Sequence, residues 1–339
     1  MLKFTIVIPV KTGKVLLEKC ITSILQQTNK DYDVVVLTDI ATKDAGIVDW
    51  LQSLRIENLR IIHTDENINI QENWDRIRAI EKGEYFTILG YDDILYPDYL
   101  DVMLALIGKH PDATLYQAHY DFIDDDGVVI EESKRMRETF SSTEYLASVL
   151  RCEYYIMATG YMIRSSDYEK IGGISADYPN ILFADYELWI RLASLGYFAV
   201  SPEKCFAFRI HQSTTKVSSD RKMLHAFGRL VTYLSSLTQD PACYQIVQEH
   251  GAHFLKYHLN FMLYRLIRKE KSMREGISVN NMLTQFQEFG AQLGLRNIDF
   301  LQMKTIKVAW YIDRFGFTRN AYLLLKKMVK KPLMVPTYK

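Results

Sequence analysis

Short apolar runs alternate with amphipathic stretches over the first hundred residues of the chain. The apolar runs have the length and composition of buried strands and cover residues 4–10, 34–37, 59–63 and 85–89. Between them, apolar residues recur at helical spacing over residues 16–25, 48–54 and 69–81. This alternation predicts an α/β fold with a mainly parallel central sheet and helices on its faces. In such sheets, ligands bind beyond the carboxyl ends of the strands.

The remainder of the chain is less regular at first and then entirely helical. Residues 114–123 and 128–130 are expected to form a hairpin around the turn Asp124-Asp125-Asp126-Gly127. Extended chain is also expected over residues 158–163 and 205–210. Helices are expected over residues 142–150, 184–195, 221–237, 242–268, 280–293 and 298–329. We therefore predict a first domain over residues 1–218 and a helical C-terminal region over residues 219–339.

The charge of the chain divides at nearly the same place. Residues 1–220 hold 22 Lys and Arg against 34 Asp and Glu, a net charge of −12. Residues 221–339 hold 19 against 7, a net charge of +12. An acidic first part suits a site that gathers metal ions, and a basic second part suits an anionic surface. The acidic part lacks the interleaved basic and aromatic residues of a nucleic-acid interface, so nucleic acid is not an expected partner.

Several classes of protein are disfavoured by what the sequence lacks. The four cysteines are scattered without a Cys-x-x-Cys pair, which favours reduced thiols, and no apolar run reaches the 18 or so residues that a membrane span requires. The N-terminus lacks the features of a signal peptide, so a cytoplasmic location is expected. The glycine-rich dinucleotide and P-loop motifs, the His-Glu-x-x-His zinc motif and the Gly-x-Ser-x-Gly elbow are all missing.

Acidic residues follow two of the predicted strands. Asp92 and Asp93 come just after the run at 85–89, where a carboxylate pair could hold a hard divalent cation or could form a polar, helix-capping turn. Asp39 follows the run at 34–37. Its carboxylate could accept the imide N–H of uracil or thymine, or could form an Asx-turn into the next helix.

Two candidates lie later in the first domain. Asp185 stands at the start of the predicted helix 184–195, where it could act as a general base toward a sugar hydroxyl or as an N-cap. His211 follows the last predicted strand. Its imidazole could join a metal or touch a diphosphate, or could have a structural role.

Taken in order, these segments resemble a family 2 glycosyltransferase of the GT-A fold, of the type that builds bacterial surface polysaccharides such as lipopolysaccharide or capsule. The resemblance covers roughly residues 3–215. The matching elements are Phe4-Thr5-Ile6-Val7-Ile8-Pro9, Leu17 with Ser23-Ile24-Leu25-Gln26-Gln27-Thr28, Val34-Val35-Val36-Leu37-Thr38-Asp39, Asn73-Trp74, Lys82-Gly83-Glu84-Tyr85, Asp92-Asp93 with Pro97, Gly172-Gly173, Asp185 with Leu188-Trp189-Ile190-Arg191, and Arg209-Ile210-His211.

The resemblance implies a nucleotide-sugar-dependent, inverting transferase. It implies nucleotide contacts from Pro9, Val10, Asp39, Asn73 and Asp92. It implies that Mn²⁺ or Mg²⁺ is held by Asp92, Asp93 and His211. It implies that Asp185 takes the proton of the acceptor hydroxyl, and that the acceptor lies near Gly172, Gly173 and Trp189.

Three positions depart from the family pattern. Thr38 stands where a second acid usually precedes Asp39, Gly90 replaces the first acid of Asp-x-Asp-Asp, and Ala184 replaces a Glu. The Gly90 departure concerns a sugar or ribose contact, and the Ala184 departure points to a different acceptor. These departures keep open a second hypothesis, a catalytically inactive GT-A-like module that binds a glycan or a partner. A sugar nucleotidyltransferase is a third, although the glycine-rich start with a following Arg is missing after Val10.

The donor and the acceptor follow from the same residues. A UDP-sugar is favoured because Asp39 suits a uracil imide, and a dTDP-sugar presents the same N–H. The acceptor implied is a hydroxyl of a glycan or of a lipid-linked glycan. Residues 322–331 form a basic amphipathic end, which would attach to the anionic inner face of the cell membrane or would simply be solvated.

Overall fold

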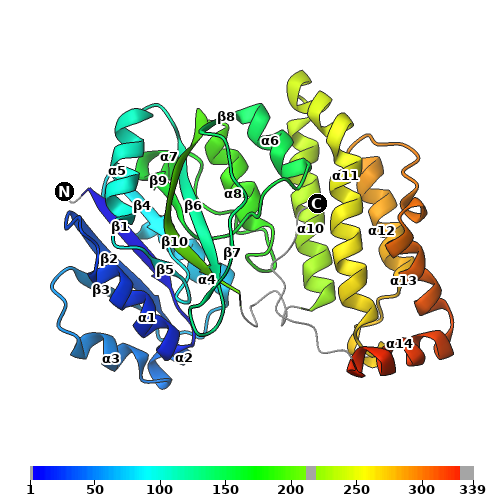
Figure 1. Ribbon diagram of the computed structural model, residues 1–339, viewed down its shortest axis with the longest axis horizontal. Coiled ribbons are helices and arrows are strands. Elements are labelled where there is room, and N and C mark those ends of the chain that lie inside the picture. Colours follow the sequence, from blue (N-terminus) through cyan, green and yellow to red (C-terminus); the bar gives the residue numbers. More distant parts are fainter. Residues whose placement is uncertain (1–2, 211–218, 329–339) are drawn as a thin grey trace. The chain divides into compact units, whose positions relative to one another are not determined.

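The computed structural model describes residues 3–210 and 219–328, which form two compact units (Figure 1). The first unit holds residues 3–145 and 156–210, and the second holds residues 146–155 and 219–328. The second unit thus includes a short segment from the middle of the chain, which the sequence pattern places in the first domain.

One twisted sheet forms the centre of the first unit (Figure 1), and its strand order is β3-β2-β1-β4-β9-β6-β10-β5. Two short strands stand off this path, with β7 paired to β6 and β8 paired to β10. The strands are β1 (Phe4–Pro9), β2 (Tyr32–Thr38), β3 (Leu59–His63), β4 (Tyr85–Ile88), β5 (Ile94–Leu95), β6 (Leu115–Ile123), β7 (Val129–Glu132), β8 (Thr139–Ser141), β9 (Tyr161–Arg164) and β10 (Tyr197–Arg209).

The parallel part of the sheet is the part built from the first hundred residues. Strands β3, β2, β1 and β4 all run in the same direction, with Ile6 opposite Val34 on one side and Thr87 on the other. Every residue of β1 and β2 is buried, as expected for strands covered on both faces. Beyond β4 the sheet is mixed, because β9 runs antiparallel to both β4 and β6. The periodicity of hydrophobic residues indicates which residues are buried but not the direction of a strand. The antiparallel pairing of β9 could therefore not be predicted from the sequence pattern.

The helices predicted before residue 210 lie close to their expected ranges, with one clear difference, whereas the helices at 40–44, 99–109 and 165–170 had no predicted range. The segment 69–81 is a short α-helix that tightens into a 3₁₀ turn and ends at Ile80, whose backbone is extended. The expected strand at 205–210 is also longer, because it is the second part of β10. The helices before residue 210 are α1 (Lys14–Leu25), α2 (Ile40–Asp44), α3 (Ile47–Ser53), α4 (Ile70–Asp75), η1 (Arg76–Ala79), α5 (Tyr99–Lys109), α6 (Ser142–Leu150), α7 (Ser165–Lys170) and α8 (Ala184–Ala193). Of these, α6 passes from the first unit into the second at residue 146.

The second unit is helical, as predicted. Its elements are α10 (Asp220–Leu237), α11 (Pro241–Ile267), η2 (Lys271–Met273), α12 (Val279–Gln292), η3 (Phe300–Gln302), α13 (Lys304–Arg314) and α14 (Gly316–Met328). Its core is aromatic, with the Phe227 ring 5.6 Å from that of Phe254 and 5.1 Å from that of Phe286, measured between centroids. The segment expected as one helix over 298–329 is broken at Phe315, whose backbone is extended. Across the described helices, none is both long enough and apolar enough to span a bilayer.

Candidate active site

The candidate residues gather where β1, β2 and β4 end. These three strands are parallel neighbours, so Pro9, Thr38 and Ile88 reach the same edge of the sheet. The loops that leave this edge carry Val10, Asp39, Asp92 and Asp93. The arrangement confirms that the predicted acids come from strand ends at one edge, the position where α/β sheets bind ligands.

Gly90 explains one of the departures from the family pattern. A Cβ atom added to Gly90 would lie 2.6 Å from Asp93 Oδ2 and 2.8 Å from Asp92 Oδ1, far inside contact distance. Both carboxylates therefore fold over the same point of the backbone, and a side chain at position 90 would displace them. The glycine at position 90 thus leaves the space that the two remaining carboxylates occupy.

Arg209 holds this acidic loop in place from the end of β10. Its backbone N–H donates to Asp93 Oδ1 at 2.9 Å, and its Nε donates to the Asp92 carbonyl at 2.8 Å. Its Nη1 donates to the carbonyls of Asp124 and Asp125 in the β6–β7 turn. Arg209 is 3% exposed. One side chain thus connects the acidic loop, β10 and the hairpin, three segments that are distant in sequence.

The chemistry of the acidic pair fits a divalent cation. Asp93 is buried, and burial, followed by repulsion from the Asp92 carboxylate, raises the pKa of Asp93 well above its usual range. Two carboxylates that approach each other at such a cost supply the hard oxygen donors that Mn²⁺ and Mg²⁺ prefer. His211, the third predicted ligand, lies outside the described residues. Within residues 3–210 and 219–328, no group of three or more His, Cys, Asp or Glu side chains is arranged around one point as metal ligands would be.

Asp39 is already bonded through both carboxylate oxygens. Its Oδ1 accepts from the N–H and the hydroxyl of Thr42, so Asp39 caps α2, and its Oδ2 lies 2.8 Å from Lys11 Nζ. Burial acts to raise the pKa of Asp39, but the bonds from Lys11 and Thr42 outweigh it and hold the pKa below its usual value. The same ammonium donates to Asn67 Oδ1 at 2.7 Å and to the Ile68 carbonyl. The predicted capping turn is confirmed, and Lys11 is a partner that the sequence analysis missed.

Asn73 joins the ends of two strands. Its Nδ2 donates to the carbonyls of Leu37 at 3.4 Å and Val10 at 3.5 Å, and its Oδ1 accepts from Arg76 at 3.0 Å. Arg76, also missed from the sequence, donates to the Thr38 carbonyl at 2.9 Å. A contact from Asn73 to nucleotide stays a prediction. What the structure adds is that Asn73 fixes the backbone of the loop carrying Pro9 and Val10.

Thr38 has a partner of its own at the same edge. Its hydroxyl lies 3.0 Å from Nδ1 of His63, the last residue of β3. Thr38 is fully buried. An acid at this position would place a second carboxylate beside Asp39 in a buried environment, so the departure at position 38 avoids that repulsion.

Asp185 is a buried carboxyl without an ion-pair partner among the described residues. It lies in the first turn of α8, is 9% exposed and accepts the Tyr186 N–H at 3.0 Å. Burial raises the pKa of Asp185 to about 7. The N-cap position belongs to Phe183, so the alternative assignment of Asp185 as the cap is wrong. Phe183 has a φ of 66°, a left-handed conformation that costs a non-glycine residue about 1–2 kcal/mol.

Trp189 ties α8 to the acidic loop. Its indole is fully buried, stacks on Tyr161 at 4.2 Å between centroids and donates to the Met157 carbonyl at 2.9 Å. Two residues after Met157, the Thr159 hydroxyl accepts the Gly90 N–H at 3.0 Å and bonds to the Asp93 carboxyl. The prediction that Trp189 faces the acceptor needs correction on this point, because the side chain packs in the core. Its contribution is to hold the helix that carries Asp185.

Gly172 and Gly173 end α7 with φ values of 74° and 73°, which glycine adopts without strain. A Cβ on Gly173 would lie 2.6 Å from Arg78 Cγ, so close packing also requires glycine there. The Gly173 carbonyl accepts from Arg191 of α8 at 3.1 Å. The structure thus supplies a reason for both glycines in the positioning of α8, and their proximity to an acceptor stays a prediction.

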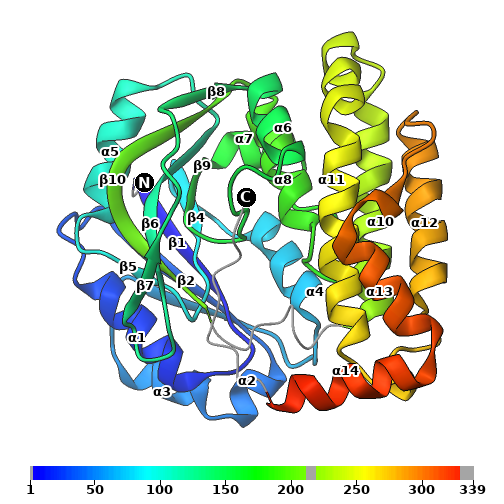
Figure 2. The same cartoon turned by 45° about the vertical axis from the view of Figure 1, so that its right-hand side comes forward.

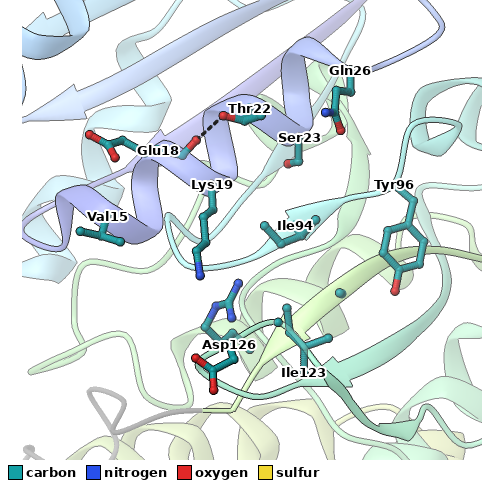
Figure 3. A pocket seen from close by; sticks show the side chains of 13 residues that line it. Val15, Glu18, Lys19, Thr22, Ser23, Gln26, Ile94, Tyr96, Ile123 and Asp126 are labelled. Atoms are coloured by element: carbon teal, nitrogen blue, oxygen red, sulfur yellow. Dashed lines mark hydrogen bonds between the residues drawn. The ribbon is translucent and has the colours of Figure 1, made fainter.

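Arg209 also lines a cavity of about 490 Å³, which is shown in Figure 3. It lies between α1, which contributes Lys19 among others, β5 with Ile94, and the β6–β7 turn with Asp126. Of the residues that build the acidic loop, Arg209 lines this cavity, whereas Asp92, Asp93 and Asp185 do not. The cavity is therefore a neighbour of the candidate active site and not a part of it.

Comparison with known proteins agrees with this geometry. Residues 5–172 match the family model described as Glycosyl transferase family 2. An uncharacterized glycosyltransferase of Methanocaldococcus jannaschii, MJ1057, is 26% identical over 222 residues, which cover 64% of this chain and 74% of that protein. An uncharacterized glycosyltransferase of Rickettsia felis is 23% identical over 240 residues, which are 70% of this chain but 39% of that longer protein.

Solved structures agree on the fold. S. aureus TarS 1-349 in complex with UDP-GlcNAc has a TM-score of 0.64 at 13% identity, with 94% of this chain and 91% of that chain covered. The mannosyltransferase PcManGT from Pyrobaculum calidifontis, in complex with GDP-Man and Mn2+, has a TM-score of 0.53 at 15% identity, with 96% and 88% covered. The first unit therefore has the GT-A fold, and residues 5–172 of the chain belong to glycosyl transferase family 2.

Proposed function

We propose that this chain is an active, metal-dependent, inverting glycosyltransferase that moves a hexosyl group from a UDP-sugar to a hydroxyl of a glycan or lipid-linked glycan. The observation that carries the proposal is the convergence of Asp92 and Asp93 over Gly90. In a protein without a cation at this site, holding the buried Asp93 carboxylate beside that of the half-buried Asp92 would cost stability with no compensating interaction. Residues 1–218 would contain the whole reaction centre, and residues 219–339 would serve attachment.

The donor would bind along the edge where β1, β2 and β4 end. The loop after Pro9 and Val10 would face the nucleotide, and Asp39 would contact the uracil ring. Because Asp39 is bonded to Lys11, an imide N–H of uracil would either meet the ion pair as a unit or displace the ammonium. Asp92, Asp93 and His211 would hold Mn²⁺ or Mg²⁺, which supplies charge neutralisation for a leaving diphosphate.

Asp185 would then act as the general base. The acceptor oxygen attacks the anomeric carbon, its proton passes to the Asp185 carboxylate, and the bond to the nucleoside diphosphate breaks with the electron pair leaving on the diphosphate. A single displacement inverts the anomeric centre. A pKa of about 7 suits this role, since a base works best when its pKa lies near the working pH.

Calorimetric titration of UDP, with GDP and dTDP as comparisons, tests the donor assignment. We expect binding of UDP with Mn²⁺, its loss with EDTA, and its loss in Asp92→Ala. Asp49→Asn is the matched control, because Asp49 is an exposed acid on α3. Binding of none of these nucleotides to the folded protein would contradict the proposal.

The second hypothesis is an inactive GT-A-like module that binds a glycan or a partner. One observation favours it, namely that both oxygens of Asp39 have donors within the protein. The two hypotheses separate on turnover: release of UDP from a panel of UDP-sugars in the presence of Mn²⁺ supports the enzyme. Glycan binding with no nucleotide binding supports the module.

A cytoplasmic location at the inner face of the cell membrane forms part of the proposal, because a lipid-linked acceptor would be found there. The predicted basic end, residues 322–331, is described as helix up to Met328, and its residues 329–331 lie outside the described residues. Support for attachment therefore has to come from α13 and the start of α14.

A further inference from the structure

We propose that an exposed aromatic and basic surface at the junction of α13 and α14 docks the protein onto an anionic lipid bilayer. This surface, named here the α13–α14 corner, consists of Val308, Tyr311, Phe315 and Phe317 with the cations Lys304, Lys307 and Arg314. The inference extends the proposed function, because it names the surface that would bring the enzyme to a lipid-linked acceptor.

The apolar part of the corner is unusually open to solvent. Val308 and Tyr311 follow Lys304 at intervals of four and three residues, so they form one stripe along α13, and Phe315 follows directly after the helix. They are 54%, 48% and 44% exposed, and Phe317 is 74% exposed. The rings of Phe315 and Phe317 lie 6.1 Å apart, so the stripe continues past the helix break. Large apolar side chains that gather in this way mark an interaction surface.

Buried bonds keep this face turned outward. The opposite side of α13 buries Ile306 and Ala309, and Asp313 pairs with the buried Arg274 at 2.5 Å. Asp313 also accepts the Val279 N–H at the start of α12, at 3.1 Å. Rotation of α13 would break this ion pair and leave the Arg274 guanidinium buried without its carboxylate. The exposed stripe therefore belongs to the folded unit and does not arise from a loosely attached helix.

The charges at the α13–α14 corner indicate that its binding partner is an anionic membrane. Lys304, Lys307 and Arg314 are exposed, and Asp313, the acid of α13, is neutralised by Arg274. The Arg314 guanidinium lies 4.8 Å from the centre of the Trp310 ring and 5.7 Å from that of Phe315. Aromatic rings beside exposed cations, on helices with little net hydrophobicity, are typical of segments that lie in the interface of an anionic membrane.

The orientation of the two helices also suits a flat surface. Figures 1 and 2 both show α14 crossing the end of the long helix α11, whereas α13 runs alongside that helix. Arg319 fixes α14 in this position, because it is buried and donates to the Lys269 carbonyl at the end of α11. The corner is therefore at one end of the helical unit, where it can reach a plane.

Vesicle sedimentation of the full chain tests the inference. We expect binding to vesicles of phosphatidylcholine with phosphatidylglycerol, weak binding to phosphatidylcholine alone, and loss of binding at high salt. Phe315→Ser with Phe317→Ser should lower the bound fraction strongly, and Lys304→Glu with Lys307→Glu should lower the partition coefficient roughly tenfold. Tyr244→Ser, at an exposed aromatic residue of α11, is the matched control and should bind like the wild type.

Two further measurements make each outcome decisive. Light scattering reports whether the corner instead joins two copies of the chain, and a dimer abolished by Phe317→Ser without vesicle binding would overturn the inference. Titration of UDP with Mn²⁺ on the same samples separates the two proposals. Intact UDP binding with no effect of the corner variants on vesicles overturns the docking surface alone, whereas lost UDP binding with intact docking counts against the proposed enzyme.

Discussion

The first unit and the second unit both bury charged side chains, but they treat the charge differently. In the second unit, Asp220 lies 2.9 Å from Arg265 and 2.7 Å from Lys269, and Asp313 lies 2.5 Å from Arg274. In the first unit, the bonds to Asp185 come from backbone N–H groups, and burial raises its pKa to about 7. The paired charges hold helical segments together. A buried carboxyl without a cationic partner costs stability, and such groups are concentrated at functional sites.

The polar bonds of the two units also differ in what they connect. In the first unit, Lys11, Arg76 and Arg209 connect loops at the carboxyl ends of strands, and Arg209 bonds to Asp93 across 116 positions of sequence. In the second unit, the ion pairs span 39 to 49 positions and hold helical segments together. The first unit therefore uses buried polarity to shape a surface, and the second uses it to hold a scaffold.

The largest expected effect tests the unpaired carboxyl. Asp185→Asn should lower kcat by about 10²–10⁴-fold with little change in UDP affinity, because it removes a base and not a donor contact. In the wild type, kcat should fall as the pH drops below about 7, since the base must be deprotonated. Steady-state kinetics from pH 5.5 to 9 measure both effects. A variant with wild-type turnover would remove Asp185 from the mechanism.

The same variant makes a prediction for stability. The folded pKa of Asp185 is raised above its ordinary value, so the carboxyl costs stability as the pH rises from about 4 to 7, and that cost is complete above pH 7. Asp185→Asn removes a cost of a few kcal/mol at most. Its melting temperature should therefore exceed that of the wild type at pH 8 and match it near pH 4. The reverse order would contradict the assignment of the raised pKa to burial.

The next effect tests the paired charges of the second unit. Asp313→Ala leaves the Arg274 guanidinium buried without its carboxylate, which should destabilise this unit by about 3–5 kcal/mol. UDP binding should be retained below the melting temperature, because the residues proposed to bind the nucleotide lie in the first unit. Calorimetric unfolding gives the stability, and Asp240→Ala, which removes a surface helix cap, is a control worth about 1 kcal/mol. Equal losses of stability in the two variants would show that the buried ion pair contributes no more than a surface helix cap.

The smallest effect tests the convergence at Gly90. Gly90→Ala places a methyl group 2.6–2.8 Å from the two carboxylate oxygens, so we expect about a tenfold loss of Mn²⁺-dependent UDP affinity, or ~1.4 kcal/mol. Gly108→Ala is the control, because its Cβ meets open space in α5 and should leave affinity unchanged. Unchanged affinity in both variants would mean that UDP binding does not depend on the positions that Asp92 and Asp93 take over Gly90.

The fold and the location of the site were largely predictable from the sequence. Buried strands and amphipathic helices have local periods, so strands β1 to β4 and their connecting helices were expected near their observed bounds. The acids at 39, 92 and 93 followed from the rule that α/β sheets bind ligands at strand ends. The long helix expected over 298–329 was wrong, because the extended backbone at Phe315 leaves no trace in the hydrophobic period.

Other features depended on contacts that no local pattern records. The sequence around Trp189 is compatible both with a contact to an acceptor and with burial in the core. Only the tertiary structure shows that its indole stacks on Tyr161 in the core. The sequence gives only a weak indication of the role of Lys11, which is a cation two positions after a predicted strand. Its link to Asp39 required β1 and β2 to be neighbours.

By itself, the sequence determined the class of fold, the division of charge between its two parts and the acids available for chemistry, because these depend on residue type and short-range spacing. The tertiary structure decided which acids meet, which are neutralised and which are left with a raised pKa. Those properties depend on burial and on partners 28 to 117 positions away. Desolvation and long-range contact are set when the strands assemble, and no stretch of sequence carries them alone.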